Sequence, residues 1–429
     1  MITRIEAYNY RCFPALSVEL GRYHVLAGAN GAGKTTFLDI PVFVGDMIRA
    51  RRVLTAVLGR QENRRAARAA ALTDLLHKGG GDAISLAIEA RLPAEVDAVL
   101  GDTSMARLGR PVPTHLRYEL QLEVTPRTLR VADEYLFLFS GAGTLPVPSS
   151  FPQGRPVTGA ELAHEDWQAV IHREGAAPTQ FIPESTSQPA DFPALRVPSS
   201  EIALGAVPAD ATLFPAATWF AGFLRGSVYF DPVPEVLRSP APPGLSERLM
   251  GAGENMPWLA LRLQDSHPEE FAAWIDQVRT ALPQIRDIRA TEREGDHFAH
   301  FTVEYEGGYH VTSPGLSDGT VKIMATTLLP FLGADAMPGL LVTEEPENGI
   351  HPRAIETVLE SLSMLRGTQV LVSTHSPIVL AHTELRDVLT TRLAEDGSVS
   401  VLQGDEHPRL REWRGEVDLG TLFAAGVLS

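Results

Sequence analysis

A chain of 429 residues with 44% hydrophobic content can bury a large core, and we expect it to divide into two lobes. The formal net charge of −16 argues against a generally basic nucleic-acid binder, although it leaves room for a local basic groove. One cysteine, Cys12, excludes an internal disulfide framework, and we expect a soluble cytoplasmic protein with no signal core and no membrane span.

The first motif is a glycine-rich loop near the N-terminus. Segment 23–27 predicts a strand, and the apolar stretch after Lys34 predicts a helix. The glycines between them allow a tight turn whose backbone N–H groups converge on a triphosphate at the helix N-terminus. Lys34 would reach the β- and γ-phosphates, and the Thr35 hydroxyl would ligate Mg²⁺. The predicted ATP contacts of this loop are Gly28, Ala29, Asn30, Gly31, Ala32, Gly33, Lys34, Thr35 and Thr36.

An ordinary glycine turn with an incidental lysine is the weaker interpretation of this loop. Lysine is scarce in the chain, because only Lys34, Lys78 and Lys322 occur among the 37 basic residues. One of the three therefore stands at the position that the motif requires. Pro41 is expected to interrupt and kink the helix that follows.

Residues 49–78 form the one concentrated basic segment of this acidic chain. One interpretation is a helical pair with a solvated arginine face, and the other is a surface for nucleic acid or a partner protein. The sequence leaves both open. The basic residues concerned are Arg49, Arg51, Arg52, Arg60, Arg64, Arg65, Arg68 and Lys78.

The middle of the chain predicts a β-rich lobe and then an irregular insertion. Alternation over 83–140 indicates antiparallel strands. From 141 to 210, recurring prolines and fading periodicity indicate loops, an irregular insertion or partial disorder. Order returns at 219–230. Ser266 and Glu269 then have the spacing of a capping box that opens a helix.

Segment 316–320 has the composition of a helix N-terminus. Ser317 would begin a helix that runs to Leu329, and its hydroxyl with the exposed amides would form a second anion site. A Ser-x-Gly sequence near the start of a helix is weak evidence of an anion site by itself. Its position 27 residues before Glu344 makes that evidence strong. Two anion sites with one magnesium site imply that a second copy of the chain completes the pocket. The predicted ATP contacts here are Ser317, Asp318 and Gly319.

The acidic motif follows a short apolar run at 340–343, which predicts a buried parallel strand with two carboxylates at its C-terminal end. Glu344 would hold Mg²⁺ through its water shell, and Glu345 would polarise the attacking water. His375 ends a second predicted strand, at 369–373, and could hydrogen-bond the γ-phosphate. The predicted catalytic residues are Glu345, His375 and Lys34, and the predicted metal ligands are Thr35 and Glu344.

Together these segments resemble an ABC-type ATPase of the SMC, RecF and OLD (overcoming lysogeny defect) group. More narrowly, the chain resembles the short stand-alone AAA-labelled ATPases of prokaryotic defence loci. The match covers residues 1–45 and about 225–429. The resemblance implies that Arg11 lies near the nucleotide. It is carried by the segments 28–36, 316–320, 344–352 and 373–377 and by the opening residues 2–13.

The resemblance implies an α/β fold, namely an ABC-type ATPase head with a P-loop mixed sheet flanked by helices, an antiparallel β lobe and an irregular or helical insertion. We expect residues 1–82 and 226–429 to form the two parts of the head, and residues 83–225 to form the accessory lobe. The chain departs from the pattern in having Glu344 where ABC proteins usually have Asp, and in reading Ser-Asp-Gly in the signature. No glutamine loop is clear, since Gln61 and Gln121 are candidates only by elimination.

The spacing of the motifs excludes several subclasses of ABC-type ATPase. Ser317 lies 283 residues after Lys34, which excludes the transporter subclass, and the gap contains no run of heptads long enough for an SMC coiled coil. Only 54 residues follow His375, which is too few for the Toprim nuclease domain of an OLD nuclease. Any nuclease or toxin action would therefore belong to a separate chain.

Three functional hypotheses remain. The favoured one is an Mg²⁺-dependent, ATP-hydrolysing homodimeric switch that controls a separate effector (a nuclease or toxin) in phage defence or acts in DNA metabolism. The others are an ATP-dependent scaffold with little turnover and a DNA-repair ATPase that binds DNA directly. ATP is expected over GTP because no guanine-reading Asn-Lys-x-Asp motif occurs.

Overall fold

The computed structural model describes residues 1–59, 66–101, 112–141, 167–184, 192–407, 410 and 418–426. The chain folds into two compact units. The first comprises Met1–Gly21, Gly31–Ser227 and Thr391–Leu402, and the second comprises Arg22–Asn30, Val228–Thr390 and Gln403–Ser429. The α/β class that the sequence predicted is confirmed. None of the helices in the described ranges is long and apolar enough to cross a bilayer.

The first unit is built on a seven-stranded antiparallel sheet in the order β2-β1-β4-β5-β6-β7-β8. The predicted antiparallel strands between residues 83 and 140 are confirmed. The irregular insertion expected at 141–210 lies partly outside the described residues, and in its described part β7 and β8 extend the sheet. The strands are β1 (Ile2–Tyr10), β2 (Phe13–Glu19), β4 (Ala83–Arg91), β5 (His115–Val124), β6 (Leu129–Phe139), β7 (Gln168–Glu174) and β8 (Gln180–Phe181).

Helix α1 of the first unit follows the glycine-rich loop and extends over Lys34–Ala50. The expected interruption at Pro41 is wrong, since the helix continues through this residue. A second helix, α5 (Pro215–Arg225), packs closely against α1, and a Cβ at Gly45 would clash with the carbonyl oxygen of Leu224. The other helices of this unit are α2 (Val53–Leu58), α3 (Ala94–Gly101) and the 3₁₀ turns Leu72–Leu75, His77–Gly79 and Ala203–Ala206.

The second unit contains a parallel sheet in the order β15-β3-β14-β13-β9. Its central strands each carry a short buried apolar run, at 25–27, 340–342 and 370–372, as expected for a sheet without a solvated face. The strands are β3 (Tyr23–Ala27), β9 (Val228–Tyr229), β13 (Leu340–Glu344), β14 (Gln369–Thr374) and β15 (Val388–Leu393), whose last three residues belong to the first unit. Strand β16 (Val399–Gln403) belongs to the first unit except for its last residue. The strands predicted at 23–27, 340–343 and 369–373 are confirmed.

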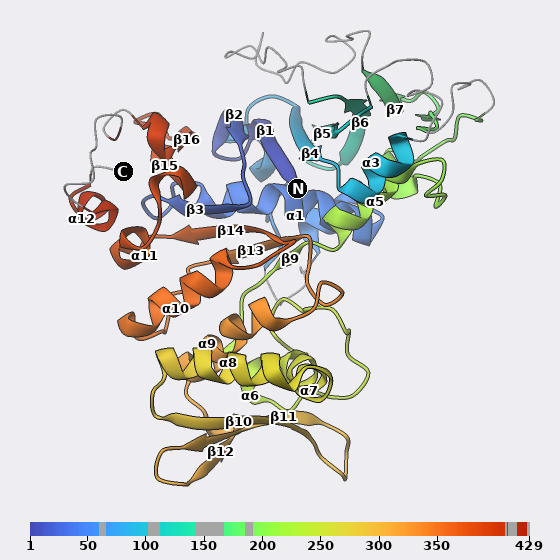
Figure 1. Cartoon of the computed structure of the whole chain (residues 1–429). Helices are drawn as coiled ribbons and strands as arrows, with labels where there is room; N and C mark the ends of the chain where they lie inside the picture. The colour runs from blue at the N-terminus through green and yellow to red at the C-terminus, as the bar shows by residue number, and fades with distance from the viewer. Residues whose placement is uncertain are drawn as a thin grey trace. The chain divides into compact units, whose positions relative to one another are not determined.

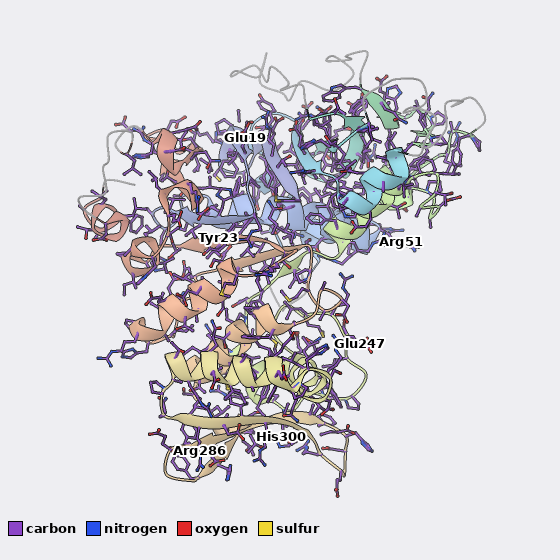
Figure 2. The ribbon with its side chains drawn as sticks, in the orientation of Figure 1. Glu19, Tyr23, Arg51, Glu247, Arg286 and His300 are labelled. Atoms are coloured by element: carbon purple, nitrogen blue, oxygen red, sulfur yellow. The ribbon has the colours of Figure 1, made fainter. Side chains whose placement is uncertain are left out.

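A separate three-stranded sheet, β10-β11-β12, lies in the same unit under α7 and α8 (Figure 1). Its strands are Ile285–Glu292, Ala299–Tyr305 and His310–Thr312, and Figure 2 labels Arg286 and His300 on it. The predicted capping box is wrong: Ser266 is the last residue of α7 (Met256–Ser266), and α8 (Pro268–Ala281) begins with His267 as its N-cap.

Helix α9 (Asp318–Leu328) is held in place by its neighbours α6 (Pro234–Arg238), α8 and α10 (Pro352–Ser363). The indole Nε1 of the buried Trp274 on α8 donates to Thr327 Oγ1 on α9 at 3.2 Å. The helix predicted to begin after Ser317 is thus confirmed, and it is anchored by a buried hydrogen bond. The remaining helices are α11 (Pro377–Ala381), α12 (Leu419–Ala424) and the 3₁₀ turns Ser313–Gly315, Leu329–Phe331, Leu385–Asp387 and Gly404–Glu406.

Candidate functional site

The glycine-rich loop joins the end of β3 to the start of α1. Gly31 and Gly33 have φ values of 78° and 77°, a left-handed conformation that glycine adopts without strain. A Cβ on Gly33 would lie 2.8 Å from Cys12 Sγ, so a side chain has no room there. Gly33 is also the N-cap of α1, and Lys34 is the first helical residue. The local geometry is that of a loop that presents backbone N–H groups at a helix N-terminus.

The carboxyl ends of three parallel strands in the second unit meet at one edge of the sheet. β13 pairs with β14 so that Glu344 lies beside Ser373, and β14 pairs with β3 so that Thr374 lies beside Ala27. Glu344 ends β13, while Glu345 and His375 directly follow β13 and β14. These three residues therefore lie at the same edge of the sheet as Gly28, which follows β3. Ligands of open α/β sheets bind at this edge.

Glu345 is held by its backbone and by both carboxylate oxygens. Its φ of 46° is left-handed, which is a strained conformation for a residue with a side chain. Its N–H donates to the carbonyl oxygen of Ser373 at 2.8 Å. Nδ1 of His375 lies 2.8 Å from Oε1, and Nδ2 of Asn348 donates to Oε2 at 2.5 Å. The two residues predicted to be catalytic in this unit are thus in direct contact.

Glu347 is a third carboxylate near this edge, and the sequence offers it, with Glu344, only as an alternative to Glu345 as the base. It is 8% exposed, and its Oε1 accepts a hydrogen bond from Thr374 Oγ1 at 2.5 Å. Thr374 Oγ1 in turn accepts from the N–H of Ser376 at 2.9 Å. Burial is the largest cause that raises the pKa of Glu347 above its ordinary value, and the negative charge of Glu345 adds to it. The sequence signal for Glu347 is its position two residues after Glu345.

The segment predicted to be a second anion site forms the first turn of α9. Ser317 is the N-cap, and its Oγ accepts from the N–H of Thr320 at 3.2 Å. The carboxylate of Asp318 is paired with Arg238 on α6. A Cβ on Gly319 would lie 2.9 Å from the carbonyl oxygen of Gly349, so α9 approaches the loop after Glu345 closely. The predicted contacts of these residues with ATP stay predictions.

Arg11 makes contacts within the first unit. Its backbone φ is 53°, its N–H donates to the carbonyl oxygen of Leu75 at 2.8 Å, and its guanidinium donates to the carbonyl oxygen of Arg68. His77 Nδ1 lies 2.9 Å from the carbonyl oxygen of Arg11. These contacts hold Arg11 in the turn after β1. Its predicted contact with the nucleotide stays a prediction.

Part of the basic segment is internal rather than a solvated face. The Arg68 side chain is only 1% exposed and forms ion pairs with Asp39 at 2.7 Å and Asp46 at 2.5 Å, both on α1. Arg49 also pairs with Asp46. Asp39 and Asp46 are seven residues apart, and so lie on one face of a largely apolar helix, which was the available sequence signal. Arg60, Gln61, Arg64 and Arg65 lie outside the described residues.

Comparison with known protein families places the chain among the AAA-type nucleotide-binding ATPases. The chain belongs to the family described as "AAA domain, putative AbiEii toxin, Type IV TA system", whose model matches residues 24–381. The resemblance to AAA-labelled ATPases that the sequence motifs indicated is confirmed at this level. A comparison with curated proteins finds no match.

Several solved structures of SMC head domains are similar to the chain. The SmcHead bound to the C-winged helix domain of ScpA has 11% identity and a TM-score of 0.48, over 94% of this chain and 96% of that one. The Smc head with an extended coiled coil bound to the C-terminal domain of ScpA, from Pyrococcus furiosus, has 11% identity and a TM-score of 0.46, over 94% and 95%. The SMC head domain from Thermotoga maritima has 10% identity and a TM-score of 0.40, over 94% and 98%.

Proposed function

We propose that this chain is an Mg²⁺-dependent, ATP-hydrolysing switch that works as a homodimer. The observation that carries the proposal is the arrangement of Glu344, Glu345 and His375 at the carboxyl edge of β13 and β14, beside the strand that leads into the glycine-rich loop. Membership of an AAA family supports nucleotide binding. This combination is suited to moving a phosphoryl group by positioning and charge stabilisation.

The residues fit a nucleotide with its magnesium ion. Mg²⁺ prefers hard oxygen ligands and is usually held by one or two carboxylates together with substrate phosphates and waters. The Thr35 hydroxyl and the Glu344 carboxylate are donors of this kind. The left-handed glycines at 31 and 33 suit a loop that wraps a phosphate with its N–H groups. Lys34 would contribute positive charge to the phosphates, and the ion would neutralise the charge that develops in the transition state.

Glu345 is proposed to act as the general base. A water molecule held by its carboxylate would attack the γ-phosphorus, the bond from that phosphorus to the bridging oxygen would break, and the water proton would pass to Glu345. The products are ADP and inorganic phosphate. His375 contacts the same carboxylate through Nδ1, so it is suited to orient the base.

Ser317 and Gly319 are proposed to serve the nucleotide of a second copy of the chain. An N-terminus of an eleven-residue helix with a capping serine is a suitable contact for a phosphate. ATP would then close a dimer, and hydrolysis would open it. The family description names a toxin and a toxin–antitoxin system, which supports control of a separate effector chain by this cycle.

Steady-state hydrolysis by the purified protein tests the basic activity. We expect ATP turnover that requires Mg²⁺ and is lost in Lys34→Ala, because that variant cannot hold the triphosphate. ATP should be preferred over GTP. Turnover in Lys34→Ala at the rate of the unaltered protein would contradict the proposal. Purification with the natural neighbours of the chain, followed by identification of the proteins that remain bound with ATP, tests the effector.

A further inference from the structure

The loop after Glu345 folds back on the carboxylate of that residue. The N–H of Asn348 donates to the carbonyl oxygen of Glu345 at 2.9 Å, which closes the four-residue turn 345–348. The Asn348 side chain then donates from Nδ2 to Oε2 of Glu345 at 2.5 Å, while His375 Nδ1 lies 2.8 Å from Oε1. Asn348 is therefore the group that fixes the second oxygen of the proposed base.

Asn348 is itself held by helix α9. Nζ of Lys322 donates to the backbone carbonyl oxygen of Asn348 at 3.0 Å. Lys322 lies one and a half turns after Ser317, the N-cap of the same helix. The close approach of Gly319 to the carbonyl oxygen of Gly349 brings the first turn of α9 against the same loop. Two independent contacts thus join α9 to the loop that carries Asn348.

We propose that Asn348 is a positioning residue for Glu345 and that Lys322 fixes Asn348, so that α9 sets the orientation of the carboxylate. This inference rests on the proposed function, in which Glu345 is the base. A general base contributes only when its carboxylate oxygen points at the water that it activates, and the hydrogen bond from Asn348 fixes the orientation of the Glu345 carboxylate. Because α9 begins at Ser317, a phosphate that binds at Ser317 would act on Glu345 of the same chain through Lys322 and Asn348.

The kinetics of Asn348 and Lys322 variants test the inference. Asn348→Ala removes a hydrogen bond to a charged group, so kcat for ATP hydrolysis should fall about ten-fold to a hundred-fold with KM for ATP unchanged. Asn348→Asp places a second carboxylate against Oε2 and should lower kcat at least as much. Lys322→Met should lower kcat by a smaller factor, and Lys322→Arg, which keeps a donor, should restore it. Lys78→Met is the matched control, since Lys78 belongs to the first unit and pairs with Asp396 of the same unit.

A double-variant comparison separates positioning from a general effect on the fold. If Lys322 acts through Asn348, adding Lys322→Met to Asn348→Ala should lower kcat no further, and the thermal unfolding midpoints of all variants should stay close together. Unchanged kcat in Asn348→Ala would overturn the inference. So would a loss in Lys322→Met that Lys322→Arg does not restore, or a rise in KM with lower unfolding midpoints. If Glu345→Gln hydrolyses ATP at the unaltered rate, the assignment of Glu345 as the base fails, whereas an unaltered protein that does not hydrolyse ATP at all would contradict the proposed function itself.

Discussion

Nδ1 of His375 lies 2.8 Å from Oε1 of Glu345, which stands 30 positions earlier in the chain. An ionised carboxylate only accepts hydrogen bonds, so in this contact Nδ1 of His375 carries the hydrogen. In a neutral ring Nε2 is then an acceptor, and it can donate to a phosphate oxygen only when the ring is doubly protonated. The predicted contact of His375 with a γ-phosphate therefore requires either that charge or the loss of the contact with Glu345.

Replacing the proposed base should separate binding from hydrolysis. Glu345→Gln keeps the shape of the side chain but cannot accept a proton from water, so kcat should fall by roughly 10²–10⁴-fold while ATP still binds. Glu360→Gln, an exposed residue on α10, is the matched control and should retain full activity. Turnover and equilibrium nucleotide binding are measured on the same preparations. Normal turnover in Glu345→Gln would require another carboxylate, Glu344 or Glu347, to be the base.

The hydrogen bond between Glu347 and Thr374 should support the loop that carries His375. Glu347→Ala leaves the Thr374 hydroxyl buried without its acceptor, which costs about 1–3 kcal/mol of folding free energy and should lower kcat. Glu347→Gln retains an oxygen that can accept and should stay close to the unaltered protein in kcat. Thr374→Val should behave like Glu347→Ala. Denaturant unfolding and kcat are the measurements, and equal losses in the Gln and Ala variants would contradict this role.

Glu184 should make the stability of the first unit depend on pH. This carboxyl is buried at the N-terminus of α5, where it accepts from the N–H groups of Ala216 and Ala217 at 2.6 and 2.9 Å. Burial raises its pKa from 4.5 to about 7. The folded state thus binds the proton more tightly than the unfolded state, and stability falls as pH rises from 4.5 through 7.

The Glu184→Gln variant isolates that contribution. A shift from 4.5 to about 7 corresponds to about 3 kcal/mol, which the unaltered protein should lose by pH 8 relative to pH 4.5. Glu184→Gln cannot ionise and should lose less over the same range. The free energy of unfolding, measured with urea at several pH values for both proteins, gives the difference. Parallel pH profiles for the two proteins would show that Glu184 does not titrate in this way.

Local sequence patterns predicted the elements that hold the candidate site. The run at 340–342 is apolar, as is typical of a strand in a buried parallel sheet, and Ser317 precedes a helix that it caps. The strand β8 was missed because it has two residues and stands among prolines, so it has no period to detect. The capping-box pattern at Ser266 failed because the previous helix extends to that residue.

Contacts between distant polar residues left no sequence pattern. Lys322 reaches Asn348 because α9 packs on the loop after Glu345, and that packing depends on tertiary contacts such as the one between Gly319 and Gly349. Arg68 belongs to a segment whose many arginines predict a basic surface, although its partners Asp39 and Asp46 lie on another element. Such contacts are decided by tertiary geometry rather than by spacing along the chain.

The central claim is that two chains share each nucleotide, and mixing two inactive variants tests it most directly. Ser317→Arg and Lys34→Ala should each be inactive alone, because each homodimer lacks one half of both sites. A mixed dimer retains one intact site, with Lys34 from the first variant and Ser317 from the second. Mixing should therefore restore part of the ATP hydrolysis. No recovery on mixing, together with hydrolysis by the unaltered protein at a specific rate independent of its concentration, would contradict the claim.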